Sequence, residues 1–198
     1  MDNNFIALVV AVYHFIQNLH TRCLEPFLAD WPMTKGLTRS ISPHTLPVLS
    51  YLPALVKAAD KKTEHLVVML AALAHHIAWG QTYSVQDFGP GFLSKYGWTE
   101  LIGLRGPIAS DRVACGFLLL GPHIEYPRHH HEAEEVYLPL TNRTLWQLGD
   151  QDWICRTPGR PVYHEPWEPH AMRTDAVPLL ALYLWRGGDL AQKSRLIP

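Results

Sequence analysis

The sequence has little net charge, and neither sign dominates any region. Its 198 residues include 17 Lys and Arg against 18 Asp and Glu, for a formal net charge of −1, and the basic residues are scattered. A chain without a basic patch has no electrostatic surface suited to nucleic acid or to an anionic membrane. We therefore expect a small-molecule partner, no nucleic acid and no membrane.

Cysteine is also scarce, occurring only at Cys23, Cys115 and Cys155 and nowhere as CxxC. An odd number of widely spaced cysteines indicates neither a disulfide framework nor a thiolate zinc site. We expect three buried, reduced thiols in a cytoplasmic protein. A long apolar run is missing as well. The stretch FIALVVAVYHF near the N-terminus has no basic region before it and is too short to span a bilayer.

The first 80 residues have helical periodicity. Apolar residues recur three and four positions apart over residues 5–19 and again over residues 66–77, so each stretch predicts an amphipathic helix. Between them, Ser42 as N-cap and Pro43 at the first helical position predict another helix, which later prolines should shorten or kink. These helices need a partner surface for their apolar sides.

After Gly80 the pattern changes to short apolar runs separated by Gly and Pro turn signals, which favours a β-sandwich or barrel. The expected strands span residues 113–120, 134–141, 144–148, 152–156, 161–164 and 179–185. We therefore expect a mainly β unit over residues 81–198, with residues 1–80 as a helical N-terminal extension packed on the barrel.

The stretch YPRHHHEAEEVY, residues 126–137, places three adjacent histidines beside three carboxylates. Along one extended strand, alternate side chains share a face. The face that collects metal-binding types carries His129, His131, Glu135 and Tyr137. Imidazole and carboxylate groups suit one divalent ion such as Fe, Mn, Zn, Co or Ni, and would be costly to bury without it.

A further metal ligand is expected from a strand that lies beside this one in space. His170 is the first candidate and His164 the second. Two alternatives are a solvated strand edge without metal, and a helix on which HExxE over residues 131–135 resembles the HExxH of zinc peptidases. Pro127 before the cluster and the β-forming residues after it favour the strand.

The same residues resemble a known superfamily. HHHEAEE contains His-x-His-xxx-Glu, the first metal motif of the cupins, and His170 stands where their second motif supplies one histidine. The second motif departs from the cupin pattern at Trp167, where a glycine is usual, and at Thr174, where an asparagine is usual. The resemblance implies a cupin barrel, a jelly-roll-like double-stranded β-helix, which by itself specifies no reaction.

Longer stretches narrow the resemblance to one enzyme family. The segments QTYSVQDFGPGFLSKYGWTELIG, YPRHHHEAEEVYLPL, PGRPVYHEPWEPHAMRT and LYLWRGGDL are similar to the Q type (DddQ) of the cupin dimethylsulfoniopropionate (DMSP) lyases, over roughly residues 45–190. The resemblance implies cleavage of DMSP into dimethyl sulfide, acrylate and a proton. The residues that match the family's active site are Tyr126, His131, Glu135, Tyr137 and His170, while His129 completes the general cupin motif.

The chemistry of DMSP suggests a role for each of these groups. A divalent metal bound to the substrate carboxylate makes the proton on the neighbouring carbon more acidic, and loss of that proton expels dimethyl sulfide. Tyr137 is expected to act as the base, or else as a metal ligand, because a nearby cation favours its phenolate. Tyr126 is expected to position the carboxylate or to transfer a second proton. Aromatic faces should hold the sulfonium, and the candidates are Trp185, Tyr183 and Trp167.

Two other functions stay open at this point. One is a cupin metal oxygenase or isomerase that acts on another small carboxylate or sugar, and the other is a non-catalytic cupin that only binds a small ligand. We expect a monomer or homodimer. The glycines and aromatics of residues 82–97 predict a mobile lid over the site, with an ordinary surface loop as the alternative.

Overall fold

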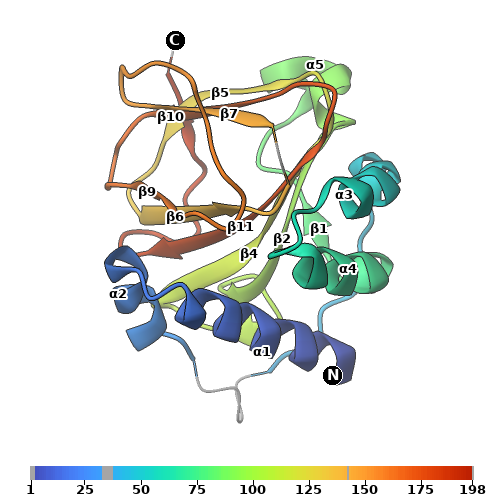
Figure 1. Ribbon diagram of the computed structural model, residues 1–198, viewed down its shortest axis with the longest axis vertical. Helices are drawn as coiled ribbons and strands as arrows, with labels where there is room; N and C mark the ends of the chain where they lie inside the picture. The colour runs from blue at the N-terminus through green and yellow to red at the C-terminus, as the bar shows by residue number, and fades with distance from the viewer. Residues whose placement is uncertain (1–2, 33–37, 142, 198) are drawn as a thin grey trace.

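Two β-sheets face each other in the protein, and helices cover the outer side of the larger sheet (Figure 1). The computed structural model describes residues 3–32, 38–141 and 143–197. The expected mainly β architecture with a helical N-terminal extension is confirmed. In the described part of the chain, no helix is long and apolar enough to cross a membrane.

The helical extension precedes the first strand. Its elements are α1 (Asn3–Asn18), η1 (Arg22–Leu24), α2 (Glu25–Ala29), η2 (Pro47–Tyr51), α3 (Leu52–Ala58), α4 (Glu64–Leu73) and η3 (Ala74–His76). α1 and α4 confirm the first and last predicted helices, and each buries the apolar stripe expected of it. The helix start at Ser42 and Pro43 is wrong. Leu46 is extended (φ −127°, ψ 155°), as residues before proline usually are, so the helical segment begins at Pro47.

Within the described residues, the larger sheet has seven strands and the smaller has five. The strands of the larger sheet are β1 (Trp79–Gly80), β2 (Tyr96–Gly103), β3 (Ile108–Ala109), β4 (Val113–Leu120), β6 (Glu134–Pro139), β9 (Val162–His164) and β11 (Leu179–Arg186). Their order is β1-β2-β4-β11-β6-β9, with β3 paired to β2. The strands of the smaller sheet are β12 (Arg195–Leu196), β5 (Glu125–His130), β10 (His170–Thr174), β7 (Thr144–Leu148) and β8 (Ile154–Cys155), in that order.

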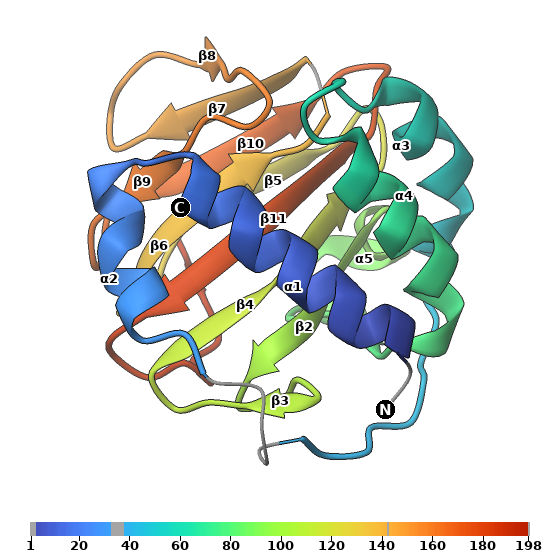
Figure 2. The ribbon, with the colours of Figure 1, turned by 60° about the horizontal axis from the view of Figure 1, so that its bottom comes forward.

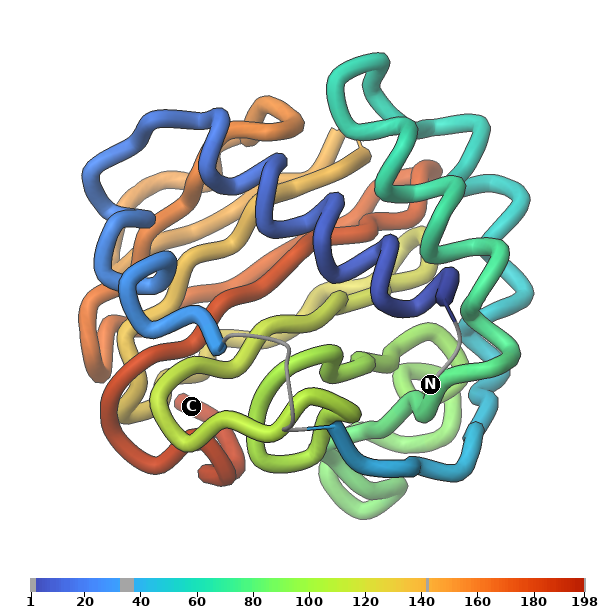
Figure 3. Tube along the Cα trace, turned by 90° about the horizontal axis from the view of Figure 1, so that it is seen from below, coloured from blue at the N-terminus to red at the C-terminus, as the bar shows by residue number. Residues whose placement is uncertain are grey.

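All six predicted strands exist, as β4, β6, β7, β8, β9 and β11, with ends that shift by two residues or fewer. Both faces of β4 and β11 are buried, which explains their continuous apolar sequences. On their outer face, Phe117 and Leu182 join the core that the helices complete, while Leu118 and Tyr183 belong to the inner core. Figure 2 shows α1 lying across β11, β4 and β2, and Figure 3 shows the same arrangement from the helical side.

The expectation of three buried thiols is only partly correct. Cys115 is buried in β4, Cys23 is half-buried, and Cys155 is exposed. Cys155 lies on β8, an edge strand whose two residues are both exposed. All three are free cysteines.

The glycine-rich segment over residues 82–97 contains a helix, α5 (Val85–Leu93). Ser84 caps its first turn and Asp87 completes a capping box. Gly89 breaks the helical geometry with φ 73°, a value that favours glycine. The predicted lid therefore has a short, kinked helix at its centre, next to the aromatic cluster inside the barrel.

Candidate active site

The histidine cluster lies at a corner where the chain passes from one sheet to the other. β5 ends at His130 in the smaller sheet, and β6 begins at Glu134 in the larger one. The single extended strand expected for residues 129–137 is therefore wrong, and so is the helical HExxE alternative, because residues 132–133 form a bend between the two strands. The side chains still converge, because the bend places the end of β5 and the start of β6 so that their inward side chains point into the space between the sheets.

Three of the predicted ligands form a compact buried group. The ligand atoms of His131, Glu135 and His170 all lie within 4.8 Å of one another. His131 Nε2 lies 2.9 Å from Glu135 Oε2, and His170 Nε2 lies 3.3 Å from the same oxygen. All three side chains are at most 1% exposed. This group could hold a metal ion, and each residue comes from a different part of the barrel: the corner, β6 and β10.

Backbone carbonyls fix the tautomers of the imidazoles. A carbonyl oxygen only accepts hydrogen bonds, so an Nδ1 beside one carries the proton and leaves Nε2 with a lone pair. The three pairs are His129 with Pro127 (2.8 Å), His131 with Ala133 (2.9 Å) and His170 with Glu168 (2.9 Å). In the neutral imidazole the lone pair of His131 Nε2 faces an anionic oxygen 2.9 Å away, an arrangement that a shared proton or a metal ion stabilises. The donor set fits a divalent metal on this ground.

The charges of the site suit the same ion. Burial alone would raise the pKa of Glu135, but without an ion the positive charge and the hydrogen bonds that His131 and His170 supply outweigh burial and lower that pKa below its usual value, so the carboxylate is anionic. Burial and the neighbouring His170 lower the pKa of His129 well below its usual value, so this imidazole is neutral. Neutral imidazoles with one carboxylate are ligands typical of Fe, Mn, Zn, Co or Ni.

Two further imidazoles flank His170, and neither belongs to the compact group. His129 faces His170 across β5 and β10, with ring centroids 4.2 Å apart, and it stacks on Tyr126 at 4.1 Å. The His164 ring on β9 lies 4.1 Å from that of His170. Within the described residues, neither nitrogen of His164 has a hydrogen-bond partner. Of the two, His129 alone has its Nδ1 hydrogen-bonded to a backbone carbonyl, as His131 and His170 do.

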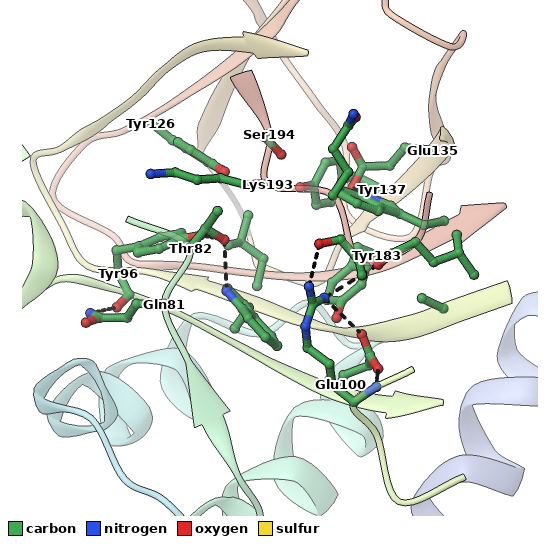
Figure 4. Close-up of a pocket in the computed structure, with 18 residues that line it drawn as sticks. Gln81, Thr82, Tyr96, Glu100, Tyr126, Glu135, Tyr137, Tyr183, Lys193 and Ser194 are labelled. Carbon is green, nitrogen blue, oxygen red and sulfur yellow. Dashed lines mark hydrogen bonds and ion pairs between the residues drawn. The ribbon is translucent and has the colours of Figure 1, made fainter. Parts of the chain in front are cut away.

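A cavity of about 250 Å³ opens beside the group, between the two sheets (Figure 4). Tyr137 from β6, Tyr183 and Trp185 from β11, and Tyr126 from β5 line it together with Glu135. Trp167 lies elsewhere, in the turn before His170. It is 40% exposed, and its ring contacts His130 and Arg195. The structure therefore brings the other predicted substrate-binding residues together but not Trp167.

Part of the cavity wall was not predicted. Tyr96, Trp98 and Glu100 on β2 point to it, and their spacing of two is the signal of a strand with one inward face. We expected a glycine-rich lid and a turn there instead. The far C-terminal segment, residues 190–194, also lines the cavity. Arg105 holds it by donating to the carbonyl of Ala191 at 2.7 Å.

The tyrosines of the cavity are protonated when no cation is nearby. Burial raises the pKa of Tyr126, Tyr137 and Tyr183 well above the usual value, and Glu135 raises that of Tyr137 further. The Tyr126 hydroxyl lies 3.2 Å from the Tyr83 hydroxyl, which links it to the segment that contains α5. A phenolate at Tyr137 therefore requires a positive charge close to it.

Comparison with known proteins places this arrangement in one family. The sequence matches the dimethylsulfoniopropionate lyase family over residues 33–181. The chain belongs to the DMSP lyase family. It is 32% identical over 176 residues to the dimethylsulfoniopropionate lyase DddQ of Ruegeria pomeroyi, which covers 86% of this chain and 85% of that protein.

Solved structures of this family share the whole fold. The crystal structure of the DMSP lyase DddQ from Ruegeria pomeroyi DSS-3 is similar with a TM-score of 0.84 and 28% identity, over 99% of this chain and 97% of that chain. A chain from the crystal structures of the DMSP lyases RdDddP and RnDddQII is similar with a TM-score of 0.85 and 28% identity, over 98% of both chains. The expected cupin-like fold is confirmed.

Proposed function

We propose that this protein cleaves DMSP to dimethyl sulfide and acrylate by β-elimination, with one divalent metal ion held by His131, Glu135 and His170. The observation that carries the proposal is the pairing of an anionic, fully buried Glu135 with two imidazoles at the wall of a cavity rich in phenols. Membership of the DMSP lyase family supports the substrate.

The substrate has a carboxylate at one end and a sulfonium at the other. When bound, the metal ion supplies Lewis-acid stabilisation of the negative charge that develops on the carboxylate. The Tyr137 oxygen removes the proton beside the carboxylate, the electron pair left behind forms the carbon–carbon double bond, and the carbon–sulfur bond breaks. Dimethyl sulfide leaves as a neutral molecule and acrylate stays as the anion, so charge and protons balance.

Tyr137 is the proposed base because it shares the inner face of β6 with Glu135, two residues away. Its raised pKa in the absence of a cation means that its basicity depends on the occupied metal site. Direct ligation of the ion by Tyr137 is the alternative role. Tyr126, whose hydroxyl is hydrogen-bonded to that of Tyr83, positions the substrate carboxylate or transfers a second proton.

The aromatic walls of the cavity are the proposed sulfonium site. Tyr183 and Trp185 lie beside Glu135 and Tyr137 across β11 and β6, and Trp98 joins them from β2. Electron-rich ring faces attract such cations and exclude water from them. His129 is the proposed fourth ligand ahead of His164, because it has the same backbone anchor as the other imidazoles. A monomer or homodimer in the cytoplasm remains a prediction from the sequence.

One assay tests the proposal. Dimethyl sulfide in the headspace above protein and DMSP should rise with metal-loaded protein and stay at background with chelated protein. Glu135→Gln, which keeps the size of the side chain, should be inactive at the same metal concentration. Oxygen consumption without dimethyl sulfide would indicate an oxygenase instead, and binding without turnover of DMSP would indicate a non-catalytic cupin.

A further inference from the structure

Trp185 contacts the candidate metal centre through its indole nitrogen as well as through its ring. The indole N–H donates to Oε1 of Glu135 at 2.6 Å. The other carboxylate oxygen, Oε2, is the one that lies near His131 and His170. The Trp185 ring also lies against the His131 ring, with centroids 4.1 Å apart. The two oxygens of Glu135 are therefore divided between the indole and the imidazoles.

The backbone holds this contact in register. Trp185 on β11 and Glu135 on β6 are direct cross-strand partners, so their side chains leave the sheet on the same face and next to each other. The following pair, Arg186 and Glu134, forms an ion pair at 2.7 Å on the opposite face. A shift of one residue would break both contacts and turn Glu135 away from the cavity.

The indole N–H is a donor to Glu135 that an ion bound by the imidazoles leaves in place. An imidazole whose Nδ1–H is held by a carbonyl offers only a lone pair at Nε2, and an ion takes that lone pair. A fully buried carboxylate still needs a donor for its second oxygen. We propose that Trp185 is a positioning residue, whose N–H fixes the Glu135 carboxylate so that Oε2 faces the ion. The inference rests on the proposed metal site and not on the reaction.

Trp98 offers a matched control in the same cavity. Its indole N–H donates to the Thr82 hydroxyl at 3.0 Å, away from the metal-binding group. Trp185→Phe and Trp98→Phe each keep an aromatic face and remove one N–H. If Trp185 served only as an aromatic wall for the sulfonium, the two substitutions would affect the affinity of the protein for metal equally.

The test is a titration of metal-free protein with Zn²⁺ or Co²⁺ against a competing chelator. Trp185→Phe should weaken metal affinity by about 10- to 100-fold, the usual cost of losing such a partner, and should alter the visible spectrum of bound Co²⁺. Trp98→Phe should leave both unchanged. Equal affinities for Trp185→Phe and the wild type, or equal losses in both variants, would overturn the inference. A wild type that binds no metal would instead overturn the proposed function.

A measurement on the wild type covers the case in which Trp185→Phe does not fold. With ¹⁵N-labelled tryptophan, the indole N–H resonance of Trp185 should shift on addition of diamagnetic Zn²⁺, because its acceptor becomes a metal ligand. The Trp98 resonance should move far less, since its acceptor is the hydroxyl of Thr82. An unmoved Trp185 resonance at metal saturation would overturn the inference.

Discussion

Glu135 on β6 and His164 on β9 are cross-strand partners, and both side chains are completely buried inside the barrel. His164 and His129 lie on either side of His170, with ring centroids about equally close to it. The site therefore offers two imidazoles for one further metal ligand. Of these two imidazoles, His129 has its Nδ1 held by a backbone carbonyl, which leaves its Nε2 ready for an ion, whereas neither nitrogen of His164 has a hydrogen-bond partner among the described residues.

This difference predicts a ranking of metal loss. The double variant His131→Ala, Glu135→Ala should lose its stoichiometric metal, because it removes two of the three ligands that the compact group supplies. His129→Ala should weaken metal affinity, while His164→Phe should leave it near that of the wild type. Metal per protein chain after gel filtration measures the first effect, and chelator competition measures the others.

The helices provide the control, since far-ultraviolet circular dichroism should match that of the wild type in each variant. Full metal content in the double variant would contradict the proposed metal centre. A larger affinity loss in His164→Phe than in His129→Ala would move the fourth ligand to β9.

The second prediction concerns the mouth of the cavity. Lys193 in the C-terminal segment pairs with Asp87 on α5 at 3.1 Å, so the ion pair joins two segments that are far apart in the sequence. Loss of the ion pair should loosen both segments. Because Lys193 also lines the cavity, this loosening should affect substrate binding. Lys193→Ala should raise the KM for DMSP several-fold and change the thermal midpoint little, since exposed ion pairs contribute little to stability.

Glu125→Gln is the matched control for this variant. It removes an exposed ion pair with Arg173 that joins β5 and β10 outside the cavity lining. Steady-state kinetics and thermal unfolding of both variants give the comparison. Unchanged kinetics in Lys193→Ala, or equal changes in both, would mean that this pair has no part in closing the site.

Two long strands of the larger sheet, β4 and β11, were predictable because their sequence signal is local. Both β4 and β11 are apolar runs of strand length between turn signals, and burial on both faces demands such runs. β5 contains a proline and two histidines, and β10 begins with a histidine. Both strands have few β-forming residues, so their local sequence did not indicate strands. Their pairing depends on contacts between residues distant in the sequence.

The candidate metal-binding group was predicted from a single strand, which the structure does not contain. Alternation along residues 129–137 placed His131 and Glu135 together, whereas the real cause is the bend between β5 and β6. The prediction depended on the types and spacing of the residues, because a single strand and the observed bend both bring their side chains into the same space. The cavity wall formed by residues 190–194 had no such signal. Long-range contacts such as the one from Arg105 to Ala191 place it.

The third prediction separates the base from the metal ligands. Tyr137→Phe keeps the ring and its packing against Trp146 but removes the oxygen. If Tyr137 is the base, metal affinity should stay at the wild-type level while the elimination rate falls by about 10² to 10⁴, the usual cost of losing a general base. Chelator competition and the headspace assay measure the two quantities on the same samples.

Each departure from that result has a definite meaning. Parallel loss of metal affinity and activity in Tyr137→Phe would make Tyr137 a metal ligand. Near-normal release of dimethyl sulfide would exclude Tyr137 as the base and move the assignment to Tyr126, whose Tyr126→Phe variant should then show the large rate loss. Tyrosinate absorbance that appears only after metal is added would support the dependence of the Tyr137 phenolate on the ion.

The last prediction is that acid destabilises the metal-free protein through its buried imidazoles. Burial first, and then the neighbouring His170, hold the pKa of His164 well below the ordinary histidine value. In the unfolded chain this side chain titrates near that ordinary value, about 6.5. Below about pH 6.5 the unfolded chain therefore binds a proton that the folded protein does not, and stability falls as the pH falls. Above that pH the contribution is fully present.

The expected loss is up to about 1.4 kcal/mol per pH unit for one such imidazole, until its folded pKa is reached. His164→Phe keeps a ring in the space but removes the titrating group, so its unfolding free energy should fall less steeply with acid than that of the wild type. His129, whose pKa is lowered by the same causes, should still contribute in the variant. Urea unfolding of metal-free protein between about pH 7.5 and pH 5 measures the slopes. Equal slopes for the wild type and His164→Phe would show that His164 accepts a proton in the folded protein and that its environment is more polar than its burial indicates.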